Sequence, residues 1–381
     1  MRTYLDHNAG APLRSEVRDA MLVFLGPPAN PSSAHREGAR ARTAVEEARA
    51  AIAALVGGRP AEIIFTSGAT EANNLALRGV LATRPAGAGL VTTAIEHASV
   101  LETASALAHA GAALAVVPVD REGRVATDAV MAACEDRHAL VSVGLANGEV
   151  GSIAPVAEIA RALAGRSVVV HTDAAQAAGR LPLDVGALGV DLLSLSAHKL
   201  GGPAGVGALW VRRGIAVAPQ QSGGPQERGL RAGTENVAGI VGFGVAAALA
   251  RAELDAAAAH MAALTERLWA GIRGRVPVAV RNGPLGGPRL PNTLNVSFPG
   301  CAGESLLVLL DLAGIAVSLG SACAAGAAEP SHVLLAMGRD TEAARGALRL
   351  SVGPGTTPGE VDRVLDVLPR LVAQVREQSA A

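Results

Sequence analysis

The strongest constraint on this chain is an alternation of two sequence patterns through its first two-thirds. Short runs of aliphatic and β-branched residues alternate with longer segments rich in Ala, Leu, Glu and Arg. Such alternation is typical of βαβ units, in which helices join parallel strands and cover the faces of the sheet. We therefore predict an α/β fold with a mostly parallel, seven-stranded sheet. The predicted strands are residues 62–66, 90–93, 113–117, 140–145, 168–171, 192–196 and 206–211, and the predicted helices are residues 39–55, 71–81, 99–110, 127–135 and 156–163.

The last third of the chain has a different pattern. A long Ala-rich helix is predicted over residues 237–272, and a segment rich in Gly and Pro follows it. Strands at residues 295–298 and 349–352 and helices at residues 304–313 and 360–375 then indicate a smaller α+β domain. We predict a large cofactor-binding domain over residues 1–252 and a small C-terminal domain over residues 253–381. The first fifteen residues or so could pack on the small domain.

Charge and composition exclude several classes of protein. The chain has 33 basic and 34 acidic residues, and its aromatic residues are four Phe, two Trp and one Tyr. A nucleic-acid interface, which needs a basic surface or stacked aromatic rings, is therefore not expected. The first residues lack the pattern of a secretory signal, and the apolar stretch 237–250 is shorter than the roughly 18 residues of a membrane span. We expect a cytoplasmic protein without a membrane partner.

Lys199 is the one lysine among the 33 basic residues. Because this composition uses Arg for ordinary surface cations, a retained Lys suggests a need for an amine that can lose its proton and attack a carbonyl. Survival of a single lysine by chance explains the count equally well. The neighbouring motifs must decide between the two interpretations.

Three segments place candidate groups at one edge of the predicted sheet. FTSGATEANN, residues 65–74, ends a strand and starts a helix whose N–H groups suit a phosphate, although such joints are also common as plain turns. Asp173 follows a strand, where ligands of open α/β sheets bind, although Asp in this position also often caps a helix. The strand 192–196 brings Lys199 to the same edge. Pyridoxal phosphate requires an amine, a carboxylate and a phosphate-binding site. The helix start within residues 65–74, called the phosphate cup below, is the candidate for that site.

These motifs together resemble a cysteine desulfurase of the NifS/IscS type, within the class V aminotransferase group of pyridoxal-phosphate enzymes. The resemblance covers nearly the whole chain. It implies fold type I, a homodimer, pyridoxal phosphate as cofactor and L-cysteine as substrate. It rests on the segments YLDHNAGAP, NPSSAHREG, FTSGATEANN, EHASV, HTDAAQAAG, SAHKLGGP, RAGTEN, SACAAGAAEPSHVL and LRLSVG.

The resemblance implies a cofactor role for each matching position. Lys199 matches the lysine that forms the Schiff base, and Asp173 matches the partner of the pyridine nitrogen. Gln176 matches the hydrogen-bond donor to the ring hydroxyl, and His97 matches the histidine that stacks on the ring. From the residues alone, His97 is a histidine near a strand end, where a structural role is more common. The implied phosphate-binding positions are Ala69, Thr70, Ser196 and His198, with Thr234 reaching the phosphate of the neighbouring subunit.

The resemblance also implies how the substrate is bound and where its sulfur goes. Asn147 and Arg349 match residues that hold the substrate, and a guanidinium suits a bidentate bond to an α-carboxylate. Cys323 matches the nucleophile that forms the persulfide, and its small-residue segment is expected to be a mobile loop. A small buried thiol is the usual alternative for a free cysteine, and it suits Cys134 and Cys301 better.

The function implied by the resemblance is conversion of L-cysteine to L-alanine with transfer of sulfur to an acceptor. The acceptor could be an iron–sulfur scaffold or a tRNA-thiolation protein. A selenocysteine lyase or cysteine sulfinate desulfinase on the same scaffold is the nearest alternative. A non-catalytic scaffold of the same fold is a further alternative, but every cofactor-binding position is filled. No metal site is expected, because the three cysteines lack the CxxC spacing of a metal site.

Overall fold

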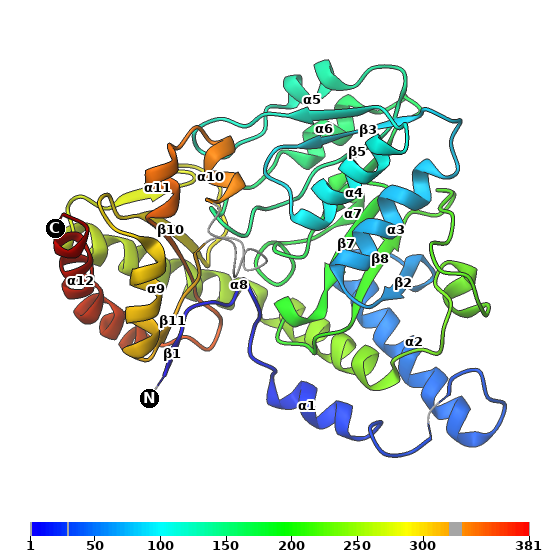
Figure 1. The fold of residues 1–381 in the computed structure, drawn as a ribbon. Helices are drawn as coiled ribbons and strands as arrows, with labels where there is room; N and C mark the ends of the chain where they lie inside the picture. Colours follow the sequence, from blue (N-terminus) through cyan, green and yellow to red (C-terminus); the bar gives the residue numbers. More distant parts are fainter. Residues whose placement is uncertain (1, 29, 320–329, 381) are drawn as a thin grey trace.

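The computed structural model describes residues 2–28, 30–319 and 330–380. Its central element is a seven-stranded sheet with the strand order β2-β8-β7-β6-β5-β3-β4 (Figure 1). Within this sheet β8 runs antiparallel to both neighbours and the other strands share one direction, which confirms the predicted mostly parallel sheet. The strands are β2 (Ile63–Thr66), β3 (Gly89–Thr93), β4 (Leu114–Val117), β5 (His138–Ser142), β6 (Val169–Asp173), β7 (Leu192–Ser196) and β8 (Gly207–Val211).

Helices cover both faces of this sheet, because successive side chains of a strand point to opposite sides. The helices are α2 (Arg36–Val56), α3 (Ala69–Leu81), α4 (Ala98–His109), α5 (Thr127–Ala133), α6 (Val156–Ala162) and α7 (Val185–Leu188). On one face, Leu140 and Leu192 pack with α3 and α4. On the other face, their neighbours Val141 and Leu193 pack with α2, α5 and α6.

The long helix α8 (Val237–Arg275) joins two hydrophobic cores. Phe243 and Ala247 belong to the core beneath the large sheet, whereas Leu264 and Leu268 belong to a second core. By length and composition α8 could span a membrane, but half of its most apolar window is buried inside the protein. It packs on α1 (Ser15–Leu22), on α2 and on α12 (Pro358–Ala380), as a core helix does. The long helix predicted over residues 237–272 is thus present.

The second core lies between α8, α12 and a three-stranded antiparallel sheet of order β12-β10-β9. The chain's first strand also joins this region, because β1 pairs in parallel with β11. The domain boundary at residue 252 stays a prediction. The elements here are β1 (Thr3–Tyr4), β9 (Val280–Asn282), β10 (Thr293–Ser297), α9 (Gly303–Leu312), β11 (Ile315–Ala316), α10 (His332–Ala336), α11 (Thr341–Arg345) and β12 (Ala347–Ser351).

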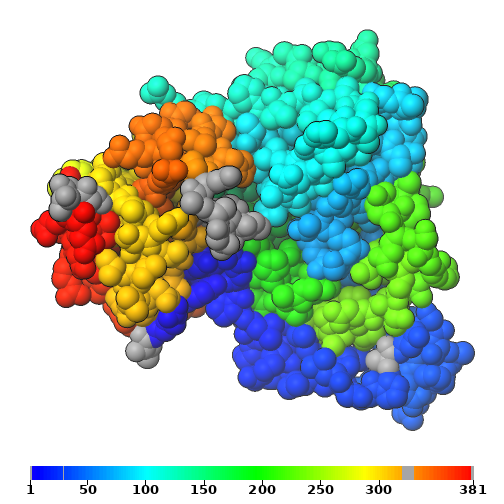
Figure 2. All heavy atoms as spheres, in the orientation of Figure 1, coloured from blue at the N-terminus to red at the C-terminus, as the bar shows by residue number. Residues whose placement is uncertain are grey.

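Short 3₁₀ turns complete the described chain. They are η1 (Pro60–Glu62), η2 (Ala197–Lys199) and η3 (Gln226–Gly229). The turn η2 follows β7 directly and carries Lys199. Figure 2 shows the surface indented between the residues near the N-terminus, in dark blue, and residues of the large-sheet region, in green.

Candidate active site

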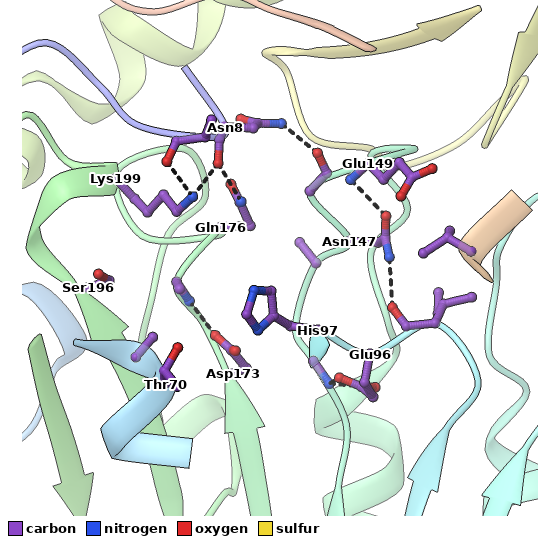
Figure 3. Close-up of a pocket in the computed structure, with 18 of the residues that line it drawn as sticks. Asn8, Thr70, Glu96, His97, Asn147, Glu149, Asp173, Gln176, Ser196 and Lys199 are labelled. Atoms are coloured by element: carbon purple, nitrogen blue, oxygen red, sulfur yellow. Dashed lines mark hydrogen bonds between the residues drawn. The ribbon is translucent and has the colours of Figure 1, made fainter. Parts of the chain in front are cut away.

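A cavity of about 450 Å³ opens at the carboxyl ends of the sheet strands, where ligands of open α/β sheets bind. Residues at the strand ends of the large sheet line it (Figure 3), and Asn8, His332 and Arg349 contribute to the lining from other parts of the chain. Ten of the twelve sequence-predicted site residues line this cavity: Ala69, Thr70, His97, Asn147, Asp173, Gln176, Ser196, His198, Lys199 and Arg349. Thr234 is exposed and does not line it. Cys323 lies outside the described residues.

Lys199 reaches the cavity from η2, and the N-terminal segment holds its amine. Its Nζ donates to the backbone carbonyl of Asn8 and, over 3.0 Å, to that of Ala9. The same Asn8 carbonyl accepts from Gln176 Nε2 over 3.1 Å. Arg180 donates to Gln176 Oε1 over 3.0 Å, so the Gln176 amide presents its NH₂ group toward Asn8. The backbone at residue 8 thus joins the lysine and the glutamine.

Asp173 ends β6 with its carboxylate held by two donors. Asn73 Nδ2 donates to Oδ2 over 2.7 Å, and the backbone N–H of Ala175 donates to Oδ1 over 2.9 Å. The second bond is the local contact of an Asp that starts a turn. The helix cap considered for this residue is not what forms, because the next helix begins only at Val185. The first bond ties the carboxylate to helix α3.

His97 caps α4 and faces the cavity with its ring (Figure 3). The backbone N–H of Ser99 donates to His97 Nδ1 over 3.1 Å, and Ser99 Oγ lies 2.8 Å from the same atom. Burial lowers the pKa of His97, and the nearby Lys199 and His332 lower it further, whereas Asp173 opposes them. The ring is therefore predominantly neutral near pH 7.

The N-terminus of α3 lies at the cavity, at the position predicted to bind a phosphate. Gly68 is its N-cap, and no side chain caps the helix. A Cβ on Gly207 would lie 2.6 Å from the Gly68 backbone, so β8 approaches the cup closely because residue 207 is Gly. Uncapped helix N–H groups beside small residues suit an anion.

Two further polar groups stand at the cup. Ser196 Oγ lies 2.8 Å from His198 Nδ1. Burial lowers the pKa of His198 to about 4, and Lys199 and Arg180 add to this, so the ring is neutral at pH 7. Glu71 in the first turn of α3 pairs with Arg231 at 2.9 Å, which anchors the segment that carries Thr234 beside the cup.

Arg349 brings a buried cation to the other side of the cavity. Its Nη2 donates to Asp6 Oδ1 over 2.8 Å, and its side chain is 4% exposed. Its Nε has no hydrogen-bond partner among the described residues. Asn147 also lines the cavity, but its amide is engaged: it donates to the carbonyl of Ile95 over 2.9 Å and accepts from two backbone N–H groups of the turn that follows.

Sequence reasoning did not single out several residues of this site. Asp6 and Asn8 lie within the motif YLDHNAGAP, where only their presence in the motif marked them. Asn73 is fully buried, and Glu96 lines the cavity beside His97. Burial raises the pKa of Glu96 to about 7, although hydrogen bonds from Thr93 and from the backbone at residue 144 oppose the shift. The sequence did contain a signal for Glu96, because this acidic residue directly precedes the candidate site residue His97.

These groups fit pyridoxal phosphate. Asp173 offers a carboxylate held in place by Asn73, the α3 N-terminus offers N–H groups that no side chain caps, and Lys199 offers an amine at the same cavity (Figure 3). The fold and the site define the class: an α/β enzyme scaffold of the fold-type-I pyridoxal-phosphate group.

Comparison with known proteins specifies the family. The aminotransferase class-V family model matches residues 3–364. A cysteine desulfurase IscS of Dictyoglomus turgidum is 44% identical over 98% of this chain and 95% of that protein. A cysteine desulfurase of Cereibacter sphaeroides is 47% identical over 99% of this chain and 97% of its own length. A solved NifS-like protein superposes with a TM-score of 0.92 at 40% identity, covering 98% of this chain and 100% of that one. The chain belongs to the class V aminotransferase family, among the cysteine desulfurases of the NifS/IscS type, whose members depend on pyridoxal phosphate.

Proposed function

We propose that this protein is a cysteine desulfurase that uses pyridoxal phosphate to convert L-cysteine to L-alanine and passes the sulfur on through an enzyme persulfide. The observation that carries the proposal is the meeting of Lys199, Asp173 and Arg349 at one cavity in a chain of this family. An amine, a carboxylate and a carboxylate-binding cation are the groups that an amino-acid substrate and this cofactor require.

When bound, pyridoxal phosphate supplies an aldehyde that joins covalently to amines and a ring that accepts electrons from the substrate. Lys199 would hold the aldehyde and later take the Cα proton of the substrate. Asp173 would face the pyridine nitrogen, because Asn73 keeps its carboxylate oriented into the site. Gln176 would donate to the ring hydroxyl and His97 would stack on the ring. The phosphate would lie among Ala69, Thr70, Ser196 and His198.

A homodimer completes the cup in this proposal. Thr234 is exposed and does not line the cavity of its own subunit, as expected for a residue that acts in a second copy of the chain. The ion pair between Glu71 and Arg231 fixes the start of the segment that carries Thr234. Thr234 would then donate to the phosphate held by the neighbouring subunit.

Arg349 would bind the α-carboxylate of L-cysteine. Its Nε–H has no partner among the described residues, while Asp6 keeps the guanidinium in place. A buried donor without a partner is costly, and a bound carboxylate would remove that cost. Asn147 would contribute through its one uncommitted amide hydrogen, since its other bonds hold the turn.

Cys323 would accept the sulfur. Its thiolate attacks the substrate sulfur, so that an S–S bond forms as the C–S bond breaks and the electron pair stays on carbon, where a proton completes the methyl group of L-alanine. The persulfide then passes to an acceptor protein in the cytoplasm, such as an iron–sulfur scaffold or a tRNA-thiolation protein.

The test compares three single variants after incubation with L-cysteine. Cys323→Ser should keep its bound cofactor and lose both persulfide and alanine, because a hydroxyl gives almost no nucleophile at neutral pH. Cys134→Ser and Cys301→Ser are the matched controls, since both thiols are buried and burial raises the pKa of each. They should keep persulfide formation. Undiminished alanine from Cys323→Ser would reject the proposed nucleophile and favour a lyase.

A further inference from the structure

A chain of hydrogen bonds runs behind the cavity wall from Asp173 to His97. Asn73 Nδ2 donates to Asp173 Oδ2 over 2.7 Å and to Ser99 Oγ over 2.9 Å. Ser99 Oγ in turn lies 2.8 Å from His97 Nδ1. Asn73 has no exposed surface and Ser99 is buried, so water does not compete for these bonds. The chain links three elements: β6, α3 and the start of α4.

The carboxylate fixes the direction of every bond in this chain. An ionised carboxylate accepts and cannot donate, so the group of Asn73 that faces Asp173 must be its NH₂. The other proton of that NH₂ goes to Ser99 Oγ, and Asn73 Oδ1 has no partner among the described residues. A buried oxygen without a hydrogen-bond partner lowers the stability of the fold. We infer that Asn73 is present for the two hydrogen bonds that its NH₂ group donates. Ser99 thus accepts from Asn73 and keeps its own hydroxyl proton to donate.

The acceptor of that proton is His97 Nδ1, which also accepts from the backbone N–H of Ser99 over 3.1 Å. Two donors aimed at one ring nitrogen require a lone pair there. A neutral imidazole then carries its proton at Nε2, on the far side of the ring from the chain. Figure 3 shows this ring extending into the cavity.

We propose that Asn73 and Ser99 are positioning residues that hold His97 as the Nε2–H tautomer. The ring then presents an N–H donor to the cavity and no lone pair. His97 can donate a hydrogen bond to the sulfur or carboxylate of a bound amino acid, but it cannot take a proton from the substrate while Nε2 keeps its own. This inference rests on the proposed function where it names the substrate, whereas the tautomer itself does not depend on it.

The experiment reads the tautomer from ¹⁵N chemical shifts of the histidine-labelled holoenzyme at neutral pH, with the His97 signals assigned by their loss in His97→Gln. The wild type should show His97 predominantly as Nε2–H. In Ser99→Ala the ratio of Nε2–H to Nδ1–H should fall roughly fivefold, which corresponds to the loss of one hydrogen bond. Ser99→Thr keeps the hydroxyl and should restore the ratio.

Thr103→Val is the matched control. Thr103 lies one turn further along α4 and donates to Asn74 Oδ1 over 2.9 Å, so the variant also loses a buried hydroxyl bond to an α3 amide. It should leave the His97 ratio unchanged. A wild-type ring protonated at Nδ1, an unchanged ratio in Ser99→Ala, or an equal change in Thr103→Val would overturn the proposal. Alanine release from L-cysteine is measured on the same samples. Its absence in the wild type would reject the desulfurase and leave the tautomer result standing.

Discussion

Arg349 and Asp6 form an ion pair 2.8 Å long at the cavity, although they come from opposite ends of the chain. The N-terminal segment reaches this position because β1 pairs with β11 and Asp6 forms a bridge with Ser351 of β12. Asp6 therefore orients the guanidinium before any substrate binds. A cation held this way recognises a carboxylate with little loss of side-chain freedom.

Replacing Arg349 by Lys should weaken binding of L-cysteine. An ammonium cannot keep the Asp6 bond and also donate to a carboxylate in the geometry of a guanidinium. We expect kcat/KM to fall about 10- to 100-fold, mainly through KM, as for a lost charge-assisted hydrogen bond. Alanine formation over a range of L-cysteine concentrations measures this.

Arg267→Lys is the matched control for that variant. Arg267 donates from two nitrogens to Asp362, each over 2.8 Å, but this pair is exposed. Its kinetics should equal those of the wild type. Equal kcat/KM in the Arg349 and Arg267 variants would contradict the assignment of Arg349 to the substrate carboxylate.

Lys199 gives a labelling prediction, because the chain contains no other lysine. Borohydride reduction of the holoenzyme should fix the cofactor on one peptide, which contains residue 199. Lys199→Arg should abolish turnover, since a guanidinium that stays charged cannot form the covalent link. Peptide mass spectrometry checks the site. Label on the N-terminal amine alone would refute the assignment.

Arg49 and Glu227 give a stability prediction away from the cavity. Arg49 donates from two nitrogens to Glu227 over 2.8 and 2.7 Å, and the backbone N–H of Phe65 donates to the same carboxylate over 2.7 Å. Both side chains are buried. Glu227→Gln leaves the buried Arg49 charge with the largely exposed carboxylate of Glu46, 3.0 Å from its Nε, as its remaining ionic partner among the described residues. The variant should lower the free energy of unfolding by about 3–5 kcal/mol. Urea unfolding measures this, and a loss below about 1 kcal/mol, typical of exposed pairs, would contradict it.

Periodicity predicted the long elements of the fold and failed for the short ones. All seven strands of the large sheet were found, and β7 matches residues 192–196 at both ends. The strands β1 and β11 have two residues each, too few for a hydrophobic periodicity to be recognised. They form because they pair with each other, although they are far apart in the sequence. The helix α1 was also missed, since its eight residues bury a single apolar side chain, Val17.

The residues of the site likewise fall into those that the sequence could predict and those that it could not. Lys199 and Asp173 were predictable because strand ends of a parallel sheet meet at one edge and because the lysine is unique. The roles of Asn73 and Asp6 were not, since each depends on a bond between distant segments. Sequence patterns report which residues follow a strand, whereas they do not report which polar groups become partners after folding.

His171 gives the last prediction, on the pH dependence of stability. Its ring is fully buried between Ser142 and Ser194, whose hydroxyls lie 2.8 and 3.0 Å from its two nitrogens. Burial lowers the pKa of His171 from 6.5 to about 4, although Asp173 opposes the shift. Below pH 6.5 the unfolded chain binds a proton at this position that the folded chain does not bind until about pH 4. The contribution of His171 to the free energy of unfolding is therefore fully present above pH 6.5, and it is lost as the pH falls toward 4.

The variant His171→Gln isolates this contribution. Gln does not titrate, so its free energy of unfolding should fall less steeply with decreasing pH, by up to about 1.4 kcal/mol per pH unit. His7 and His198, whose pKa values burial also lowers to about 4, are present in both proteins and cancel in the difference. Urea unfolding at fixed protein concentration at several pH values between 6.5 and 4 gives the two curves. The gap between wild type and variant should narrow as the pH falls, by about 3 kcal/mol over the whole interval. Parallel curves would show that His171 takes up its proton equally in the folded and unfolded states.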